Sequence, residues 1–347
     1  MSTTPLFKLN TNAVIPAIAH GAYAGRDREQ LYKAKAWLTT ALSAGYRHFD
    51  AAWIYATEPI LGEVIRESGV PREELFITTK LPWHHVHKVE ESINQSLERL
   101  GVDYVDLYLM HWPQPAEFHS DEDYLPLTEA GDLEVDDSIT FNEVWAAMEK
   151  LVPTGKVKAI GVSNFSIKTL EQLLEKAKIV PAANQVELSP ILAQSDLVDF
   201  CRSKGIVIEA YGATGYAGVT EQPLIVELAA KYKCTPNQVT LGWHVARGVI
   251  PVVVSTNVHR QKENLQFPVL EKEDVDKVTS LDRNERQVNK PNDNGKVWGW
   301  TVNSIVDSES NNLYESLLNF IDICGYTARR TTHALRRRID RFAAVIT

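Results

Sequence analysis

The sequence predicts an α/β fold of the (β/α)8 TIM-barrel class, with an N-terminal β-hairpin that caps the bottom of the barrel. Eight short apolar segments alternate with helical patterns, as expected of a parallel sheet closed on itself. Several of these segments are continuously apolar, which suits strands covered on both faces. The alternative is an open doubly wound sheet, but we find no GxGxxG motif after a strand, so the barrel is favoured.

The elements follow one another in a regular order. A turn signal at Asn10-Thr11-Asn12 separates the two short strands of the hairpin, 7–9 and 13–15. The eight barrel strands are predicted near Ile18–Tyr23, Tyr46–Asp50, Leu75–Lys80, Val105–His111, Val157–Ser163, Ala182–Glu187, Ile206–Tyr211 and Val249–Ser255. Apolar residues at helical spacing predict helices over Val89–Leu100, Ile167–Ala177 (with Ser166 as its cap), Leu224–Tyr232 and Pro236–Val245.

Composition narrows the class of protein. The 347 residues are 44% hydrophobic and 23% charged, which excludes a disordered chain and collagen-like sequences. The net charge of −9 argues against nucleic acid and anionic membrane as partners. Three scattered cysteines favour reduced thiols over a disulfide framework or a zinc site, and we recognise neither a signal peptide nor a spanning segment. These features predict a cytoplasmic protein.

Four polar residues stand at or just after neighbouring strand ends, where a barrel places its chemistry. Asp50, Lys80 and His111 end the second, third and fourth strands, and Tyr55 follows Asp50 by five residues. Each residue alone has a structural explanation, but a single reaction explains all four. The long acidic segment 114–138, which follows the fourth strand, is predicted to be a loop on the same face.

The reaction is delivery of a proton to a developing alkoxide. A tyrosine with its usual pKa of about 10 is a poor donor at neutral pH. A neighbouring Lys80 ammonium stabilises tyrosinate and lowers that pKa, and Asp50 holds the lysine in place. His111 can orient the substrate oxygen or relay the proton.

At these residues the chain resembles the aldo-keto reductase superfamily, and within it fungal sugar and small-aldehyde reductases. The resemblance rests on Gly45–Ala52 with Tyr55, on Leu107–Pro113 and on Gly155–Phe165, and it spans about residues 7–302. It implies a barrel domain over residues 1–302 and an enzyme that reduces aldehydes or ketones to alcohols. In that family Tyr55 is the general acid, and Asp50, Lys80 and His111 complete the catalytic tetrad.

The resemblance also implies a cofactor and a set of contacts for it. Hydride comes from NADPH, with NADH as a second cofactor, bound extended across the barrel mouth without a Rossmann fold. The implied cofactor-binding residues are Ser163, Asn164, Gln185, Tyr211, Ser255, Thr256, Arg260, Glu263 and Asn264. The implied substrate-binding residues are Tyr23, Trp53, Trp83 and Trp112. The partner is a small carbonyl compound, no metal is expected, and the chain is expected to be a monomer or a weak dimer.

The sequence departs from the family pattern in four places. His20–Tyr23 and Tyr211–Gly215 differ from the usual motifs at the pocket edge and in the loop over the pyrophosphate, and Val254 stands where NADPH-preferring relatives commonly have lysine. Residues 303–347 form an atypical tail with a basic end, either a segment for an anionic partner or membrane surface or a poorly ordered appendage.

Two other classes of function stay open at this point. One is a non-catalytic relative that uses the barrel for binding, against which the intact tetrad speaks. The other is a metal-dependent hydrolase, which the cluster His84-His85-Val86-His87 suggests, although no carboxylate stands at metal-ligand spacing.

Overall fold

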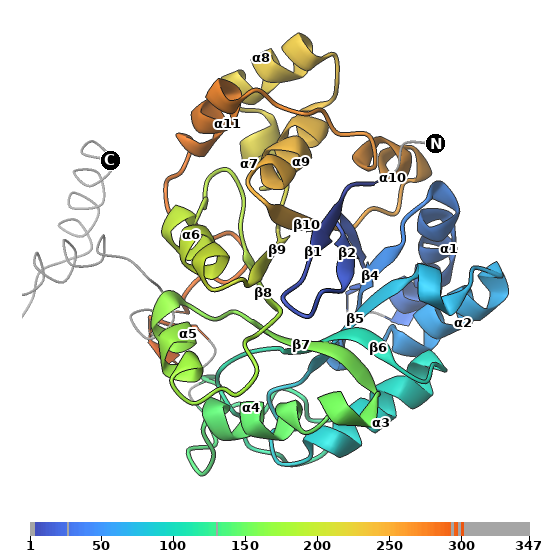
Figure 1. Ribbon diagram of the computed structural model, residues 1–347, viewed down its shortest axis with the longest axis vertical. Coiled ribbons are helices and arrows are strands. Elements are labelled where there is room, and N and C mark those ends of the chain that lie inside the picture. Colours follow the sequence, from blue (N-terminus) through green and yellow to red (C-terminus); the bar gives the residue numbers. More distant parts are fainter. Residues whose placement is uncertain (1–3, 26–27, 130, 293–294, 298–299, 302–347) are drawn as a thin grey trace, which may run out of the picture. The chain divides into compact units, whose positions relative to one another are not determined.

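The computed structural model describes residues 4–25, 28–129, 131–292, 295–297 and 300–301. Eight parallel strands close into a barrel in the order β10-β3-β4-β5-β6-β7-β8-β9, and helices surround it (Figure 1). The barrel strands are β3 (Ala19–Gly21), β4 (His48–Asp50), β5 (Phe76–Leu81), β6 (Val105–Met110), β7 (Val157–Ser163), β8 (Ala183–Glu187), β9 (Val207–Tyr211) and β10 (Val249–Val253). All eight predicted strands are confirmed, with ends that differ from the prediction by up to two residues.

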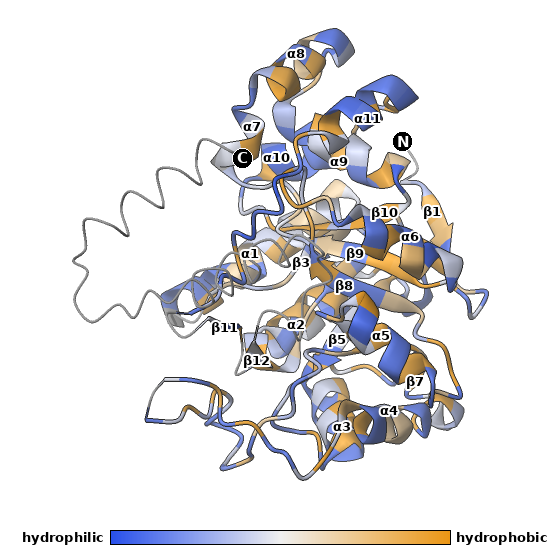
Figure 2. Cartoon of the chain, turned by 90° about the vertical axis from the view of Figure 1, so that its left-hand side faces the viewer, coloured by the Kyte–Doolittle hydropathy of each residue, from blue (hydrophilic) through white to orange (hydrophobic). Residues whose placement is uncertain are grey.

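The helices α1 to α11 fill the connections between the strands. They are α1 (Arg28–Ala44), α2 (Glu58–Ser68), α3 (Val89–Leu100), α4 (Phe141–Glu149), α5 (Ile167–Leu174), α6 (Ser195–Ser203), α7 (Ala217–Thr220), α8 (Pro223–Tyr232), α9 (Pro236–Ala246), α10 (Val258–Asn264) and α11 (Lys272–Thr279). The predicted cap of α5 is confirmed, because the Ser166 side chain accepts a hydrogen bond from the backbone N–H of Thr169. Hydropathy alternates along the outer helices in Figure 2, as expected of helices that cover a barrel.

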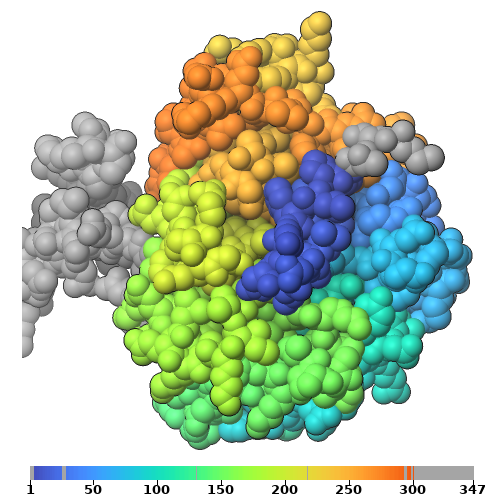
Figure 3. Space-filling view, viewed as in Figure 1, coloured from blue at the N-terminus to red at the C-terminus, as the bar shows by residue number. Residues whose placement is uncertain are grey.

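The hairpin of β1 (Leu6–Lys8) and β2 (Val14–Pro16) closes one end of the barrel, as predicted. Leu9 and Ile15 are buried against core side chains of the barrel, among them Phe76 and Leu107. Asn10 Nδ2 donates to the carbonyl oxygen of Pro181 at 3.0 Å, just before β8. Figure 3 shows the hairpin lying across the barrel end. The opposite end, where the strands finish, is therefore left for the functional site.

The segment 114–138 is an irregular loop beside that open end, as predicted. Its backbone is held by isolated bridges between Ala116 and Val135 and between Leu127 and Leu133. The backbone N–H of Ala116 donates to the carbonyl oxygen of Trp83 at 2.9 Å, which places the start of the loop against the end of β5. Near the C-terminal end of the described chain, β11 (Lys296–Val297) and β12 (Trp300–Thr301) form a small antiparallel pair.

The histidine cluster after β5 secures this loop. His87 Nε2 lies 2.7 Å from Asp136 Oδ2, and Lys88 Nζ lies 2.5 Å from Asp121 Oδ1. His84 and His85 are buried beside Phe118, and burial lowers their pKa values to about 4 and about 3. No group of three or more histidine, cysteine, aspartate or glutamate residues suited to a metal ion occurs among the described residues. The contacts give the cluster a structural explanation.

Two further predictions concern membrane-spanning segments and the C-terminal tail. None of the helices in the described ranges is long and apolar enough to cross a membrane. The predicted tail, residues 303–347, lies outside the described residues.

Candidate active site

Asp50, Tyr55 and Lys80 meet at the open end of the barrel. Lys80, in β5, points its Nζ at both carboxylate oxygens of Asp50 at the end of β4, at 2.7 and 2.8 Å. The same Nζ donates to the Ala51 carbonyl oxygen at 2.9 Å and lies 3.4 Å from the hydroxyl of Tyr55. The lysine side chain is fully buried, so its position is fixed by these oxygens.

Tyr55 reaches this cluster from a short 3-10 turn, Trp53–Tyr55, directly after β4. Ala56 ends the turn with a left-handed φ of 58°, which redirects the chain into α2. The tyrosine ring packs edge-on against Tyr23, at 5.1 Å between ring centroids, and against His111, at 5.7 Å. The structure therefore brings all four predicted tetrad residues together.

Burial and the neighbouring charged groups together set the protonation states of Lys80 and Tyr55. Burial alone lowers the pKa of Lys80, but the nearby groups Asp50, Tyr55 and Glu209 outweigh it, so the pKa of Lys80 is raised and the ammonium persists. Burial raises the pKa of Tyr55 more than Lys80 lowers it. Lys80 thus lowers the pKa of Tyr55, as the sequence predicts, but burial outweighs it and the pKa lies above its usual value. At neutral pH Tyr55 carries its proton, which is the form that a proton donor needs, and Lys80 stabilises the anion left behind.

His111 stands directly after β6 and lines the same space. Burial, assisted by the charge of Lys80, holds its pKa well below the usual value, so the imidazole is neutral. Its Nδ1 has no hydrogen-bond partner among the described residues. A neutral imidazole can carry its proton on Nε2 and donate it to a substrate oxygen without adding a charge to the site.

These side chains open into a cavity of about 660 Å³ at the barrel mouth. Among the predicted site residues, the cavity is lined by Tyr23, Asp50, Tyr55, Trp83, His111, Trp112, Ser163, Asn164, Gln185, Tyr211, Ser255, Thr256, Arg260 and Asn264. Three predicted residues do not line it. Lys80 is enclosed behind Asp50 and Tyr55, Glu263 is exposed on α10, and Trp53 is buried elsewhere.

The position of Trp53 differs from the implied pocket-lining role. Its Nε1 donates to Gln95 Oε1 at 2.8 Å, and its ring lies 4.5 Å from the ring of His85. The guanidinium of Arg99 covers the ring at 4.2 Å. These partners on α3 and the loop before it turn the indole away from the mouth, so Trp53 supports the wall of the site from behind.

Beside the tetrad, amide side chains present unused acceptor capacity. Asn164 Nδ2 donates to the His111 carbonyl oxygen at 2.9 Å and to Ser163 Oγ at 3.1 Å. Its Oδ1 accepts from the Tyr211 hydroxyl at 2.5 Å, which leaves one lone pair. Gln185 donates from its side-chain nitrogen to Asp50 and to Glu209, so its carbonyl oxygen stays available. Such acceptors suit the amide N–H groups of a nicotinamide carboxamide.

The far end of the cavity is built by the turn from β10 into α10. Asn257 caps α10 by accepting hydrogen bonds from the backbone N–H groups of His259 and Arg260, at 2.9 and 3.2 Å. Arg260 is exposed there, and Val254 is 51% exposed at the cavity edge. The cavity thus runs from a buried reaction centre to an exposed cation, as an extended dinucleotide phosphate requires.

The unusual His20 acts outside the cavity. It is fully buried, and its Nε2 lies 3.3 Å from the carbonyl oxygen of Ser255, at the start of the turn after β10. The next residue, Gly21, lines the cavity, where an added Cβ would come within 2.9 Å of Val254 Cγ2. The departure from the family motif therefore ties β3 to the phosphate end of the cavity.

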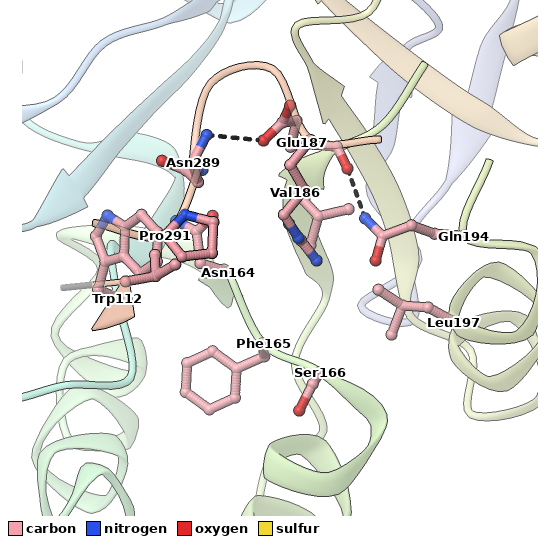
Figure 4. A pocket seen from close by; sticks show the side chains of 12 residues that line it. Trp112, Asn164, Phe165, Ser166, Val186, Glu187, Gln194, Leu197, Asn289 and Pro291 are labelled. Carbon is pink, nitrogen blue, oxygen red and sulfur yellow. Dashed lines mark hydrogen bonds between the residues drawn. The ribbon is translucent and has the colours of Figure 1, made fainter. Parts of the chain in front are cut away.

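Sequence reasoning missed a second set of contacts. The Glu187 carboxylate, at the end of β8, accepts hydrogen bonds from the backbone N–H groups of Gln287, Val288 and Asn289, at 2.5, 2.9 and 3.0 Å. Figure 4 shows the contact between Glu187 and Asn289. Asn289 Nδ2 in turn donates to the Tyr211 hydroxyl. A small cavity of about 30 Å³ lies behind this contact. The strand-end position could have singled out Glu187, but nothing in the sequence marked Asn289.

Comparison with known proteins agrees with this geometry. The model of the aldo/keto reductase family matches residues 18–283, a range that includes all four residues of the predicted tetrad. The chain belongs to the aldo/keto reductase family, and it is an oxidoreductase that acts on carbonyl groups.

Three relatives illustrate the range of the match. The chain is 44% identical over 302 residues to glycerol 2-dehydrogenase (NADP(+)) of Saccharomyces cerevisiae, covering 84% of this chain and 95% of the relative. It is 40% identical over 291 residues to aldehyde reductase YPR1 of the same organism, covering 81% and 92%. The structure of the aldose reductase from Schistosoma japonicum superposes with a TM-score of 0.76 at 32% identity, covering 82% of this chain and 94% of that one.

Proposed function

We propose that the protein reduces the carbonyl group of sugars or small aldehydes to an alcohol with NADPH, using Tyr55 as the general acid. The observation that carries this proposal is the buried Lys80 ammonium, 3.4 Å from the Tyr55 hydroxyl and paired with Asp50, at the base of a 660 Å³ cavity. Chemistry that needs a protonated phenol and a stabilised phenolate explains why these three groups are held together.

The residues divide the work of the reaction. A nicotinamide bound in the cavity would supply the hydride for the carbonyl carbon. Neutral His111 donates a hydrogen bond to the carbonyl oxygen, and Tyr55 transfers its proton to that oxygen as negative charge develops. Lys80 stabilises the resulting tyrosinate. Trp83 and Trp112, which are only 2% and 7% exposed, keep water from the reacting groups.

The cofactor contacts follow the cavity. Ser163, Asn164 and Gln185 would hold the carboxamide through their hydroxyl and amide groups, and the Tyr211 ring would stack on the nicotinamide. At the other end, Ser255, Thr256, Arg260 and Asn264 would bind the adenosine phosphate, with Glu263 at the exposed edge. We propose NADPH as the preferred cofactor and NADH as a weaker one. A relative at 44% identity is named for NADP(+), which supports this choice.

The substrate side of the cavity is aromatic. Tyr23, Trp83 and Trp112 line it together with Ile54. Relatives are named for glycerol, for aldehydes and, at 39% identity over 275 residues in Hypocrea jecorina, for D-galacturonate. Initial rates with glyceraldehyde, pentoses, a uronic acid and an aromatic aldehyde, each with NADPH and NADH, test the proposal. No turnover of any of them would favour a non-catalytic binding role.

We expect Val254→Lys to improve kcat/KM for NADPH and to leave NADH nearly unchanged. Val254 lines the cavity close to Arg260 in sequence but offers no charge to a 2′-phosphate. One added charge-assisted contact is worth roughly 1.5–3 kcal/mol, or about 10- to 100-fold. Both cofactors should be measured at one fixed salt concentration, because salt screens phosphate contacts.

Val258→Lys is the matched control for that prediction. Val258 begins α10, is 37% exposed, and does not line the cavity, so the same charge there should change neither cofactor's kcat/KM by more than about 3-fold. Unchanged NADPH kinetics in Val254→Lys would mean that position 254 does not meet the phosphate.

The remaining organisation of the chain is also a proposal. We propose a barrel domain over residues 1–302 with a separate tail over 303–347, a monomer or weak dimer, and the cytoplasm as the compartment. The thiols of Cys201 and Cys234 in the described part of the chain support a reducing compartment. A chain ending at Ser304 is expected to keep the melting temperature and kcat/KM of the full chain. An insoluble or inactive truncated protein would show that the barrel needs the tail in order to fold or to act.

A further inference from the structure

Glu209 is a buried carboxyl group that the tetrad mechanism does not use. It lies in β9, two residues before Tyr211, so both side chains point into the barrel, and Glu209 sits one step deeper. Its side chain is fully buried, and it stands in register with Gln185 on β8 and Ile250 on β10. A carboxyl group this deep needs hydrogen-bond partners, and those partners lead to the reaction centre.

The first partner is the side-chain amide of Gln185. Its Nε2 donates to Asp50 Oδ1 at 2.8 Å and to Glu209 Oε2 at 3.3 Å. An amide nitrogen has two hydrogens, so the two carboxyl groups use both of them. This arrangement fixes the orientation of the Gln185 amide and leaves its carbonyl oxygen for the cavity that Gln185 lines.

The other groups that face Glu209 decide its charge. Oε1 lies 3.4 Å from His48 Nε2, while Asp50 and Lys80 act on the carboxyl group through their charges. Burial and Asp50 raise the pKa of Glu209 to about 8, against the opposing effects of Lys80 and Gln185. Burial lowers the pKa of His48 to about 3. At neutral pH both groups are uncharged. Glu209 Oε1 has no hydrogen-bond partner among the described residues, and His48 Nε2 lies 3.2 Å from Thr78 Oγ1.

We propose that Glu209 is a positioning residue that holds the Gln185 amide toward the cofactor and, by remaining uncharged, leaves the Lys80 ammonium to Asp50 and Tyr55. The Lys80 ammonium then has a single carboxylate partner, Asp50. If Glu209 ionises, a second carboxylate competes for Lys80, and Tyr55 becomes harder to deprotonate. The inference rests on the proposed function, because it assigns the acidity of Tyr55 to a group behind the tetrad.

The pH profile of alcohol oxidation with NADP⁺ tests the charge. Oxidation needs ionised Tyr55, so its kcat rises with pH as the phenol deprotonates. In the wild-type protein, Glu209 becomes charged near pH 8. Its charge acts on Lys80, and through Lys80 it is expected to hold the pKa of Tyr55 up. Glu209→Gln cannot ionise, so its profile is expected to rise at a pH about one unit lower. Superimposed profiles would overturn the inference.

Binding of NADPH, followed by quenching of tryptophan fluorescence, tests the positioning without turnover. Glu209→Gln keeps an oxygen that accepts from Gln185, so the Kd should stay within about 3-fold of wild type. Glu209→Leu removes one of the two acceptors of the Gln185 amide and leaves only Asp50 to orient it, so the Kd should rise by roughly 3- to 10-fold. An equal Kd for NADPH in Glu209→Gln and Glu209→Leu would contradict the proposal that Glu209 positions the Gln185 amide.

Glu58 provides the matched control. It is also fully buried with a pKa raised by burial, but its contacts are Thr79 Oγ1 at 2.6 Å and Arg99 Nη1 at 3.7 Å. Glu58→Gln should therefore leave the pH profile and the Kd unchanged. If Glu58→Gln shifts the pH profile as much as Glu209→Gln does, the shift follows from the loss of any buried carboxyl group and not from the position of Glu209.

A spectroscopic measurement checks the protonation directly. The infrared difference between wild type and Glu209→Gln at neutral pH is expected to contain the carbonyl stretch of a protonated carboxyl group, and its absence would overturn the inference. The proposed function fails in a different way: the wild-type protein would then reduce none of the carbonyl compounds and bind no NADPH, and the inference would fall with it.

Discussion

Replacing Tyr55 with phenylalanine is expected to lower kcat for carbonyl reduction by about 10²- to 10⁴-fold, the usual contribution of a general acid. The hydroxyl lies 3.4 Å from Lys80 Nζ, and Tyr55 lines the cavity. His111, which lines the same cavity, is neutral with a strongly lowered pKa. The ring contacts with Tyr23 and His111 do not involve the hydroxyl, so NADPH binding should stay within about 3-fold of wild type.

The measurement combines initial rates, read from NADPH absorbance, with fluorescence titration of the cofactor. Tyr108→Phe is the control. This substitution also removes a hydroxyl from a fully buried tyrosine, but that hydroxyl lies 3.4 Å from Ser92 Oγ on α3. This control should keep its kcat. A Tyr55→Phe variant whose rate stays within a few-fold of the parent would show that another group delivers the proton.

Removing Lys80 should also disable the enzyme, through Tyr55 rather than through the substrate. Without the ammonium, burial and the charge of Asp50 act on the phenol unopposed, and the pKa of Tyr55 rises further. A neighbouring opposite charge is worth about 1–3 pKa units, so reduction should slow by roughly 10- to 10³-fold. The pH profile of alcohol oxidation should move to higher pH, because the tyrosinate that acts as the base forms later.

The design of this variant must respect the buried ion pair. Lys80→Met alone leaves Asp50 charged and unpaired in the barrel, which is expected to cost about 3–5 kcal/mol of folding free energy. The double variant Asp50→Asn with Lys80→Met removes both charges and should fold with a higher melting temperature than the single variant. It should be as slow as Lys80→Met. Recovery of the wild-type rate in the double variant would mean that the lysine only neutralises Asp50.

The strands and the tetrad could be predicted because their signals are local. A run such as Val249–Val253 identifies a buried strand by its own composition, and a barrel joins neighbouring strand ends by a fixed rule. Asp50, Lys80 and His111 follow strands that are consecutive in both sequence and space, so the rule brings them together. Ser166 was likewise predicted as a cap from its place before α5 alone.

The pocket walls show where such local signals end. Trp53 and Trp83 are both aromatic residues just after strands, but only Trp83 lines the cavity. Gln95 and Arg99 on α3 hold the Trp53 ring away from the mouth. Which way a side chain in a turn points depends on the helix packed beside it, and that helix lies about forty residues further along the chain.

By itself, the sequence determined the barrel, its capping hairpin and which four side chains of the predicted tetrad meet at the barrel mouth, since each depends on short patterns and on the order of strands. Only the tertiary structure decided how those residues are tuned. Barrel closure brings Gln185 of β8 to Asp50 of β4 across 135 residues, and it places Glu209 beneath them. The direction of the Tyr55 pKa also emerged only there, because desolvation depends on every group that excludes water from the site, and no local pattern records that sum.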